Sequence, residues 1–240
     1  MKSIFIAGAS GAIGRRMLPI LKQRDYKVFG TTRSQEKANA LSAEGIEPIV
    51  LDVFDAQAVR AAILRLRPNV IVHQLTDLPY GLTPALMPEA AVRNARIRKE
   101  GTKNLIDAAI AAGVQHFIAQ SIAFVYAPGS EPHVESDPID APAGPRAVTL
   151  EGVHALESLT LNSTGIQGAV LRYGMLYGPR TGKDDRDGLS IPVHVDAAAH
   201  AAFLAIHHRA TGIFNIVEDN AHVANTKARR ELEWSPDFRI

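Results

Sequence analysis

The first fourteen residues constrain the fold more than any other stretch. Residues 3–7 are short and almost wholly apolar, which predicts a buried parallel strand. Three glycines at spacing G-x-x-G-x-x-G follow at once, at Gly8, Gly11 and Gly14, and a helical pattern begins beyond them. Such glycines permit a tight turn and a close approach of the backbone to a pyrophosphate, and the helix N-terminus offers free N–H donors. The stretch therefore predicts a dinucleotide-binding βα unit.

The rest of the chain alternates predicted strands with predicted helices. Helices are expected over 35–43, 56–66 and 88–112, the last interrupted near Gly101, and strands over 27–32, 47–51, 69–73, 115–120, 166–172 and 212–217. This alternation predicts a parallel sheet with helices on both faces. We expect an α/β fold with a Rossmann-type, doubly wound parallel sheet of about seven strands. Residues 1–240 should form a single domain.

Composition excludes several classes of protein. A formal net charge of +1 gives no reason to expect a nucleic-acid partner. The chain has no cysteine, which rules out disulfides, thiolate zinc sites and a cysteine nucleophile, and fits a cytoplasmic protein. Residues 108–129 carry no formal charge, but polar residues and a glycine interrupt them, so we expect no membrane span. The expected partner is a small-molecule substrate, bound by a monomer or a homodimer.

Two irregular loops interrupt the alternation, each after a predicted strand. Residues 127–145 hold five prolines and two glycines, and residues 178–192 are charged and contain glycine. Ligands of open α/β sheets bind at the carboxyl edge of the strands, where both loops begin. We therefore expect these loops, with segment 193–240, to form the substrate side of the site.

Motifs along nearly the whole chain resemble those of short-chain dehydrogenases/reductases, in the extended or atypical branch that includes NAD(P)-dependent epimerases and dehydratases. The matching stretches occur in the family's order: the glycine turn, Leu51 to Val53, Asn94 with Gly101 to Leu105, Gln120 to Tyr126, Leu171 to Pro179, His194 to Asp196, Gly212 to Ile216 and Leu232 to Pro236. The resemblance implies a nicotinamide cofactor. The residues expected to bind it are Gly8, Ser10, Gly11, Ala12, Ile13, Gly14, Arg15, Arg33, Asp52, Val53, Gln74, Leu75, Thr76, Asn94, Ser121 and Tyr173.

The end of the second predicted strand indicates which cofactor is preferred. An acidic residue there would accept hydrogen bonds from the ribose 2′-OH of NAD, but this chain has Thr31-Thr32-Arg33-Ser34. The Arg33 guanidinium can pair with a 2′-phosphate, and Arg15 offers a second positive charge. NADP is therefore the expected cofactor, with NAD as the alternative. By the resemblance, Asp52 and Val53 border the adenine, and residues 74–76 line the nicotinamide side.

The chain departs from the family at the expected catalytic residues. The resemblance implies a tyrosine followed four residues later by a lysine, but the aligned positions hold Thr149 and Val153, and no Tyr-x-x-x-Lys occurs in the sequence. Neither residue can replace an acidic phenol and a charged amine. Ser121 matches the family hydroxyl that polarises a substrate oxygen. Tyr126 and Tyr173, at predicted strand ends, are the candidate phenols.

No metal site is expected. His194, Asp196 and His200 have a metal-ligand composition, but we interpret Asp196 as the N-cap of the alanine-rich helix that runs to His207.

Three functions remain open from the sequence. The first is an NAD(P)-dependent oxidoreductase acting on a small carbonyl or hydroxyl substrate with a non-standard catalytic site. The second is a sugar-nucleotide epimerase or dehydratase. The short segment after Val217 disfavours it, because the resemblance implies a larger substrate lobe there, so we expect the C-terminal substrate lobe of this chain to be reduced. The third is a non-catalytic NADPH-binding redox sensor. The absence of both members of the family's catalytic dyad, the tyrosine and the lysine, favours it. The two irregular loops favour the first, and we adopt it as the expectation.

Overall fold

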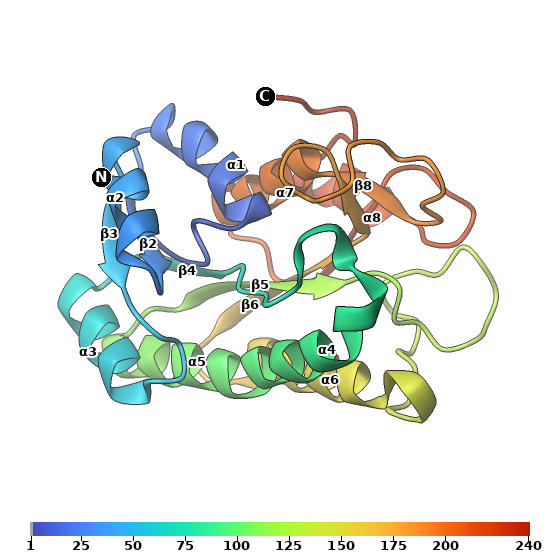
Figure 1. Ribbon diagram of the computed structural model, residues 1–240, viewed down its shortest axis with the longest axis horizontal. Helices are drawn as coiled ribbons and strands as arrows, with labels where there is room; N and C mark the ends of the chain where they lie inside the picture. Colours follow the sequence, from blue (N-terminus) through green and yellow to red (C-terminus); the bar gives the residue numbers. More distant parts are fainter. Residues whose placement is uncertain (1) are drawn as a thin grey trace.

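A parallel seven-stranded sheet forms the centre of the computed structural model, which describes residues 2–240 apart from the side chain of Leu82 (Figure 1). Its order is β3-β2-β1-β4-β5-β6-β9. The strands are β1 (Ser3–Ala7), β2 (Lys27–Thr32), β3 (Glu47–Val50), β4 (Val70–His73), β5 (His116–Ile122), β6 (Gln167–Tyr173) and β9 (Gly212–Ile216). Because β1 is internal and the strand order reverses between β1 and β4, the predicted doubly wound fold is confirmed.

Helices cover both faces of this sheet, as Figure 1 shows. One face carries α1 (Ala12–Lys22), α2 (Gln35–Ala43), α7 (Val195–His207) and α8 (Thr226–Leu232), and the other carries α3 (Ala56–Leu66), α4 (Met87–Arg96), α5 (Thr102–Ala112) and α6 (Ala147–Asn162). Side chains of β1 alternate between the two cores: Ile4 and Ile6 pack with α1 and α7, and Phe5 packs with α3 and α5. The glycine turn after β1 is thereby held between two buried layers.

The helix predicted over 88–112 is continuous but changes its winding. A π-helical segment, Ile97–Gly101, joins α4 to α5, so the interruption expected near Gly101 is a local widening of the helix rather than a break. Such segments occur often at functional sites. Here the segment buries Arg98, which is 6% exposed.

A small second sheet pairs β7 (Met175–Tyr177) with β8 (Pro192–His194), and it frames the loop over 178–192. The N-cap of α7 is His194, whose Nδ1 accepts the N–H of Asp196 at 3.1 Å. The interpretation of Asp196 as the cap is therefore wrong. Its buried carboxylate instead pairs with Arg16 of α1 and accepts the N–H of Ile240.

Within residues 2–240, no helix combines the length and the apolar character that crossing a bilayer requires.

Candidate functional site

A cavity of about 320 Å³ opens at the carboxyl ends of the central strands. Its walls come from the glycine turn after β1, the end of β2 with the start of α2, the loop after β3 and the residues after β4. The structure thus brings together predicted cofactor residues from four separate segments. Those that line the cavity are Gly8, Ser10, Gly11, Arg33, Asp52, Val53, Gln74, Leu75 and Thr76.

The glycine turn fits a group that must approach the backbone closely. Gly8 has φ +93°, and a Cβ there would lie 2.8 Å from the carbonyl oxygen of Gln74. A Cβ at Gly14 would lie 2.3 Å from the carbonyl oxygen of Gly8, so α1 can begin this close to the turn only with glycine. The turn and the start of α1 therefore form the cradle that a pyrophosphate requires.

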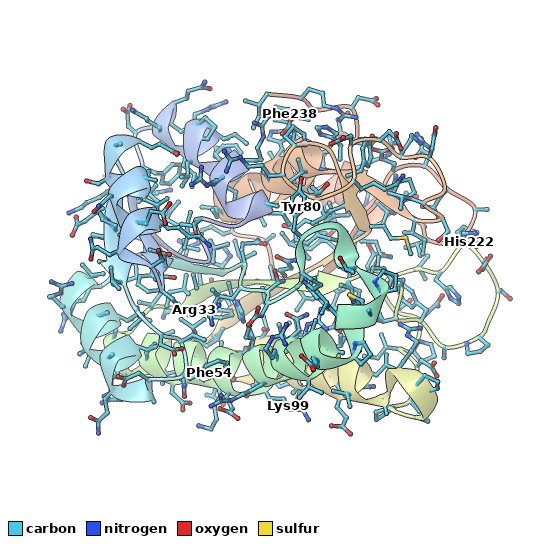
Figure 2. The ribbon with its side chains drawn as sticks, in the orientation of Figure 1. Arg33, Phe54, Tyr80, Lys99, His222 and Phe238 are labelled. Atoms are coloured by element: carbon cyan, nitrogen blue, oxygen red, sulfur yellow. The ribbon has the colours of Figure 1, made fainter. Side chains whose placement is uncertain are left out.

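Two cations stand at the α2 side of the cavity. Arg33 and Lys37 both line it, with Ser34 between them. Ser34 caps α2, since its Oγ accepts the N–H of Lys37 at 3.4 Å, which leaves its hydroxyl hydrogen available. Arg33, labelled in Figure 2, has a side chain that is 63% exposed, and its ion pair with Asp77 is long, at 3.9 Å. Together they form an anion site at a helix N-terminus.

Sequence reasoning missed Lys37. The available signal was its position one helical turn beyond Arg33, in the first turn of a predicted helix, where a side chain shares a face with the residues just before the helix.

Gln74 presents an unsatisfied acceptor at the other end of the cavity. It is 5% exposed, its Nε2 donates to the Tyr173 Oη at 3.4 Å, and its Oε1 has no hydrogen-bond partner. A buried amide oxygen without a donor is uncommon in proteins. This oxygen is available to a donor group of a bound ligand.

Tyr173 lies outside the cavity lining, in the apolar core beneath α1 and α7. It is 1% exposed, and burial raises the pKa of its phenol well above the usual value. The structure therefore gives no support to Tyr173 as a proton donor to substrate, because a phenol with a raised pKa is a weaker acid and this one does not reach the cavity.

Besides Tyr173 and Ser121, five more predicted cofactor residues lie outside the cavity lining. Ala12, Ile13 and Gly14 form the first turn of α1 directly behind the glycine turn. Arg15 points toward α2, where its Nη1 lies 3.7 Å from Glu44, and its Nε is buried without a partner. Asn94 is buried on α4 and accepts the N–H of Asp77 at 3.3 Å, which holds the loop after β4.

Ser121 is fully buried and faces α6 rather than the cavity. Its Oγ donates to the Glu157 Oε1 at 2.7 Å. The same carboxylate accepts from Arg172 Nε at 3.0 Å and Nη2 at 2.7 Å. Because the only hydroxyl hydrogen of Ser121 is committed to Glu157, this geometry does not support the prediction that Ser121 binds cofactor and polarises a substrate oxygen.

Tyr126 is held beneath the loop over 127–145. Its Oη donates to Asn215 Oδ1 at 2.6 Å, and its ring stacks on His133 with 4.9 Å between centroids. Burial raises the pKa of its phenol. The three residues proposed from the sequence as catalytic, Ser121, Tyr126 and Tyr173, therefore do not line the cavity.

The two positions that would carry the dyad lie on α6. Val153 is fully buried in an apolar cluster with Val125 and Leu150, and Thr149 is half-buried four residues before it. His154 Nε2 lies 3.0 Å from the carbonyl oxygen of Asp140, which ties the loop over 127–145 to α6. This part of α6 is therefore apolar where an acid–base pair would act.

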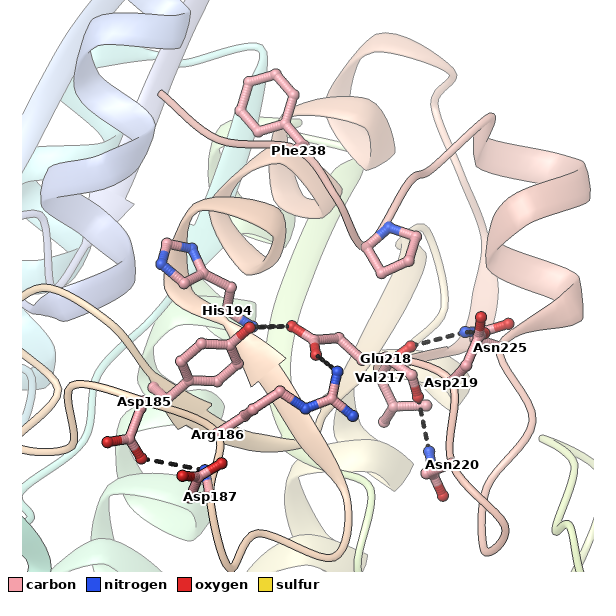
Figure 3. A network of polar contacts seen from close by, with 12 residues as sticks. Asp185, Arg186, Asp187, His194, Val217, Glu218, Asp219, Asn220, Asn225 and Phe238 are labelled. Carbon is pink, nitrogen blue, oxygen red and sulfur yellow. Dashed lines mark hydrogen bonds and ion pairs between the residues drawn. The ribbon is translucent and has the colours of Figure 1, made fainter.

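Glu218 ties the loop over 178–192 to the end of β9, as Figure 3 shows. It is 5% exposed, accepts from the Tyr177 Oη at 2.6 Å and the His194 N–H at 3.1 Å, and pairs with Arg186 at 3.1 Å. Nothing in the sequence analysis singled out this residue. The available signal was an acidic residue directly after a predicted strand, at the edge where ligands bind.

The same loop touches the segment after β4. A Cβ at Gly182 would lie 2.3 Å from the backbone nitrogen of Gly81, so the two loops pack backbone to backbone. The neighbouring Tyr80, labelled in Figure 2, is 77% exposed. The loop that follows β4 and the loop that follows β7 are therefore in direct contact.

The sequence model of the NAD dependent epimerase/dehydratase family matches residues 4–212. The chain belongs to this family. It is 38% identical to a 3-diazoavenalumate denitrifying reductase of a Streptomyces species, over 98% of this chain and 80% of that protein.

Solved structures of family enzymes share its fold. A UDP-glucose 4-epimerase of Thermotoga maritima, with UDP-glucose, superposes with a TM-score of 0.77 at 18% identity, over 99% of this chain and 94% of that one. The enzyme WbmG of Bordetella bronchiseptica, in complex with NAD, gives a TM-score of 0.77 at 18% identity, over 99% and 90%. The cavity at the carboxyl edge therefore belongs to a fold of NAD-dependent enzymes.

Proposed function

We propose that the protein is an NADPH-dependent reductase that replaces the dinitrogen group of a diazo compound by hydrogen. The observation that carries this proposal is the combination of a dinucleotide cavity with a helix, α6, that holds Thr149 and the fully buried Val153 where the family's acid–base pair is expected. The first feature calls for a nicotinamide cofactor. The second calls for a substrate whose reduction needs no proton from the protein.

The choice of NADPH over NADH rests on the α2 side of the cavity. Arg33, Lys37 and the Ser34 hydroxyl are available to a 2′-phosphate, and no acidic residue stands at the end of β2 to bind a 2′-hydroxyl. The glycine turn would hold the pyrophosphate, and the free Oε1 of Gln74 would accept from a polar hydrogen of the nicotinamide half.

The absence of the tyrosine–lysine pair favours a hydride acceptor that needs no proton from the protein. Reduction of a carbonyl produces an alkoxide that a general acid must protonate, and neither Thr149 nor Val153 can do so. NADPH, when bound, supplies a hydride, and the balanced conversion of a diazonium is R–N₂⁺ + NADPH → R–H + N₂ + NADP⁺. No proton is required, because the leaving group is neutral dinitrogen. The Streptomyces relative, named for the denitrifying reduction of a diazo-substituted carboxylate, supports the same class.

The chain's own residues would exclude water and shape the substrate side. The loops over 127–145 and 178–192 follow strands at the carboxyl edge, and Glu218 and His154 hold them in place.

The test is stopped-flow oxidation of NADPH with a panel of arenediazonium salts, aldehydes, ketones and quinones, each with a protein-free control. We expect the protein to accelerate oxidation by diazonium salts far more than by carbonyl compounds. Turnover of carbonyl compounds alone would make it an ordinary carbonyl reductase. Tight binding of NADPH without oxidation by any compound would favour a redox sensor.

A further inference from the structure

A second cavity, of about 360 Å³, opens at the edge of the sheet opposite to the cofactor cavity. The first residues of β1, β4 and β5 line it, together with the loops that join α3 to β4, α5 to β5 and α7 to β9. Because these strands are parallel, their amino ends meet at this edge and their carboxyl ends at the edge that carries the glycine turn. The second cavity is therefore separate from the site described above, and the proposed reaction does not use it.

His116, the first residue of β5, lines this cavity and has an unsatisfied ring nitrogen. It is 2% exposed, and burial lowers the pKa of its ring, so the ring is neutral near pH 7. Its Nε2 lies 3.1 Å from the carbonyl oxygen of Ala210, which can only accept a hydrogen. The proton of the ring is therefore on Nε2, and the buried Nδ1 is an acceptor without a donor.

Three cations line the same cavity without an acidic partner. They are Lys2, Arg67 and Arg209, and no acidic residue is among the described residues that line it. Within residues 2–240, none of these three side chains forms an ion pair or donates a hydrogen bond to another residue, whereas the nearby Lys27 pairs with Glu47 at 3.1 Å. The cavity therefore combines an excess of positive charge with one buried acceptor.

Helix ends alone do not account for this combination. The last residue of α3 directly precedes Arg67, and α7 ends two residues before Arg209. A cation near a helix C-terminus is favourable by itself. That effect requires neither a cavity nor a buried imidazole nitrogen without a donor. The cations and the free Nδ1 of His116 together call for a ligand that is negatively charged and also carries a hydrogen to donate.

We propose that this cavity binds a phosphate group that carries one hydrogen, as a small phosphate monoester or as free phosphate. The hydroxyl of the group would donate to His116 Nδ1, and its charged oxygens would accept from Arg67, Arg209 and Lys2. Guanidinium groups match the geometry of phosphate oxygens. The volume lies within the range of about 300–1,000 Å³ that is usual for small-molecule sites, so it leaves room for an organic part.

The first arm of the test compares ligands of similar charge and shape by calorimetric titration at pH 6, near the second pKa of a phosphate monoester, about 6. The probes are ribose 5-phosphate, inorganic phosphate and sulfate, added to the protein saturated with NADP⁺. We expect the better phosphate compound to bind at least about tenfold more tightly than sulfate, because sulfate has no hydrogen to donate to His116 Nδ1. Equal binding of phosphate and sulfate, or no binding of either phosphate compound, would overturn the proposal.

The second arm uses variants of the cavity. Arg67→Gln and Arg209→Gln, both at exposed positions, should each weaken phosphate binding about three- to tenfold. The matched control is Arg65→Gln, an exposed arginine of α3 outside the cavity lining, which should bind like the wild type. His116→Phe should abolish the preference for phosphate over sulfate. Unchanged affinity in both arginine variants would contradict the proposal, and these two variants test it even if His116→Phe fails to fold.

The third arm separates this cavity from the cofactor site, which also offers phosphate-binding groups. Binding in the second cavity should persist in the presence of NADP⁺ and in Lys37→Ala. Loss of phosphate binding under either condition would assign the phosphate to the cofactor cavity and overturn the proposal. Tighter binding of ribose 5-phosphate than of inorganic phosphate would identify a monoester as the ligand, and the reverse order would identify free phosphate. None of these measurements needs turnover, so their outcome is independent of the proposed reduction.

Discussion

Ser121 of β5 donates a 2.7 Å hydrogen bond to Glu157 of α6, and the same carboxylate holds Arg172 of β6 through both of its oxygens. All three residues are at most 5% exposed. The contact ties the helix that should carry the catalytic pair to the two strands beneath it. The contact has a structural role, because the buried carboxylate of Glu157 compensates the charge of the buried Arg172 guanidinium.

Replacing Glu157 should therefore cost stability. Glu157→Gln leaves Arg172 buried without its counter-charge, and we expect the free energy of unfolding to fall by about 3–5 kcal/mol. Urea denaturation measures this loss. The control is Glu151→Gln on the same helix, whose ion pair with Lys99 is exposed and should contribute less than about 1 kcal/mol. Equal effects of the two variants would show that the buried pair is not stabilising.

Ser121→Ala separates the structural role of this hydroxyl from a catalytic one. The variant removes one hydrogen bond to Glu157, so we expect a loss of about 1 kcal/mol in stability and an unchanged rate of NADPH oxidation. Stopped-flow traces of the wild type and the variant provide the comparison. A large fall in rate with unchanged stability would restore Ser121 as a group that acts on substrate.

The anion site at the start of α2 should decide cofactor preference. Arg33→Ala and Lys37→Ala should each weaken NADPH binding by about 1–3 kcal/mol and change NADH binding much less, because only NADPH carries the 2′-phosphate. Fluorescence titration of both cofactors measures the difference. Arg60→Ala, an exposed arginine on α3, is the control. Equal losses for both cofactors would mean that these cations do not bind the 2′-phosphate.

His73 should make stability depend on pH. Its Nδ1 accepts the N–H of Leu75 and its Nε2 lies 3.1 Å from the Thr102 Oγ1, so the neutral ring bears its proton on Nε2. Burial and Arg98 lower the folded-state pKa to about 3, whereas the unfolded value is about 6.5. Below pH 6.5 the unfolded chain binds more protons, so stability falls as the pH falls toward 3.

Urea denaturation at pH 7.5 and pH 5 measures this effect. Protonation of His73 in the unfolded state should remove about 2 kcal/mol over that interval. His73→Gln should lack this part of the pH dependence, and His207→Gln, at an exposed position of α7, should retain it. A His73→Gln variant with the pH dependence of the wild type would contradict the assignment.

Local sequence signals were sufficient for most of the fold. Residues 3–7 are an almost wholly apolar run of strand length. Helices 35–43 and 56–66 begin after Ser34 and Asp55, whose side chains cap them. Each of these signals lies within the element that it specifies. Their bounds therefore follow from the sequence.

The site was predicted less completely because its decisive contacts join distant segments. Ser121 faces away from the cavity since its partner, Glu157, lies 36 residues further along the chain. Arg98 stands in the charged run Arg96 to Glu100, and its burial depends on the packing of the π-helical segment against Gly152. Asp196 was assigned to the nearest helix end, but it pairs with Arg16, which is 180 residues away.

The central claim is that a hydride passes from NADPH to the carbon that loses dinitrogen. The most direct measurement uses NADPH deuterated at either face of nicotinamide C4, with 4-carboxybenzenediazonium as substrate and mass spectrometry of the benzoate product. The account predicts one deuterium in benzoate from one of the two labelled cofactors and none from the other, at a rate that depends on the protein. Benzoate without deuterium from both cofactors, or deuterium incorporated equally with and without protein, would contradict it.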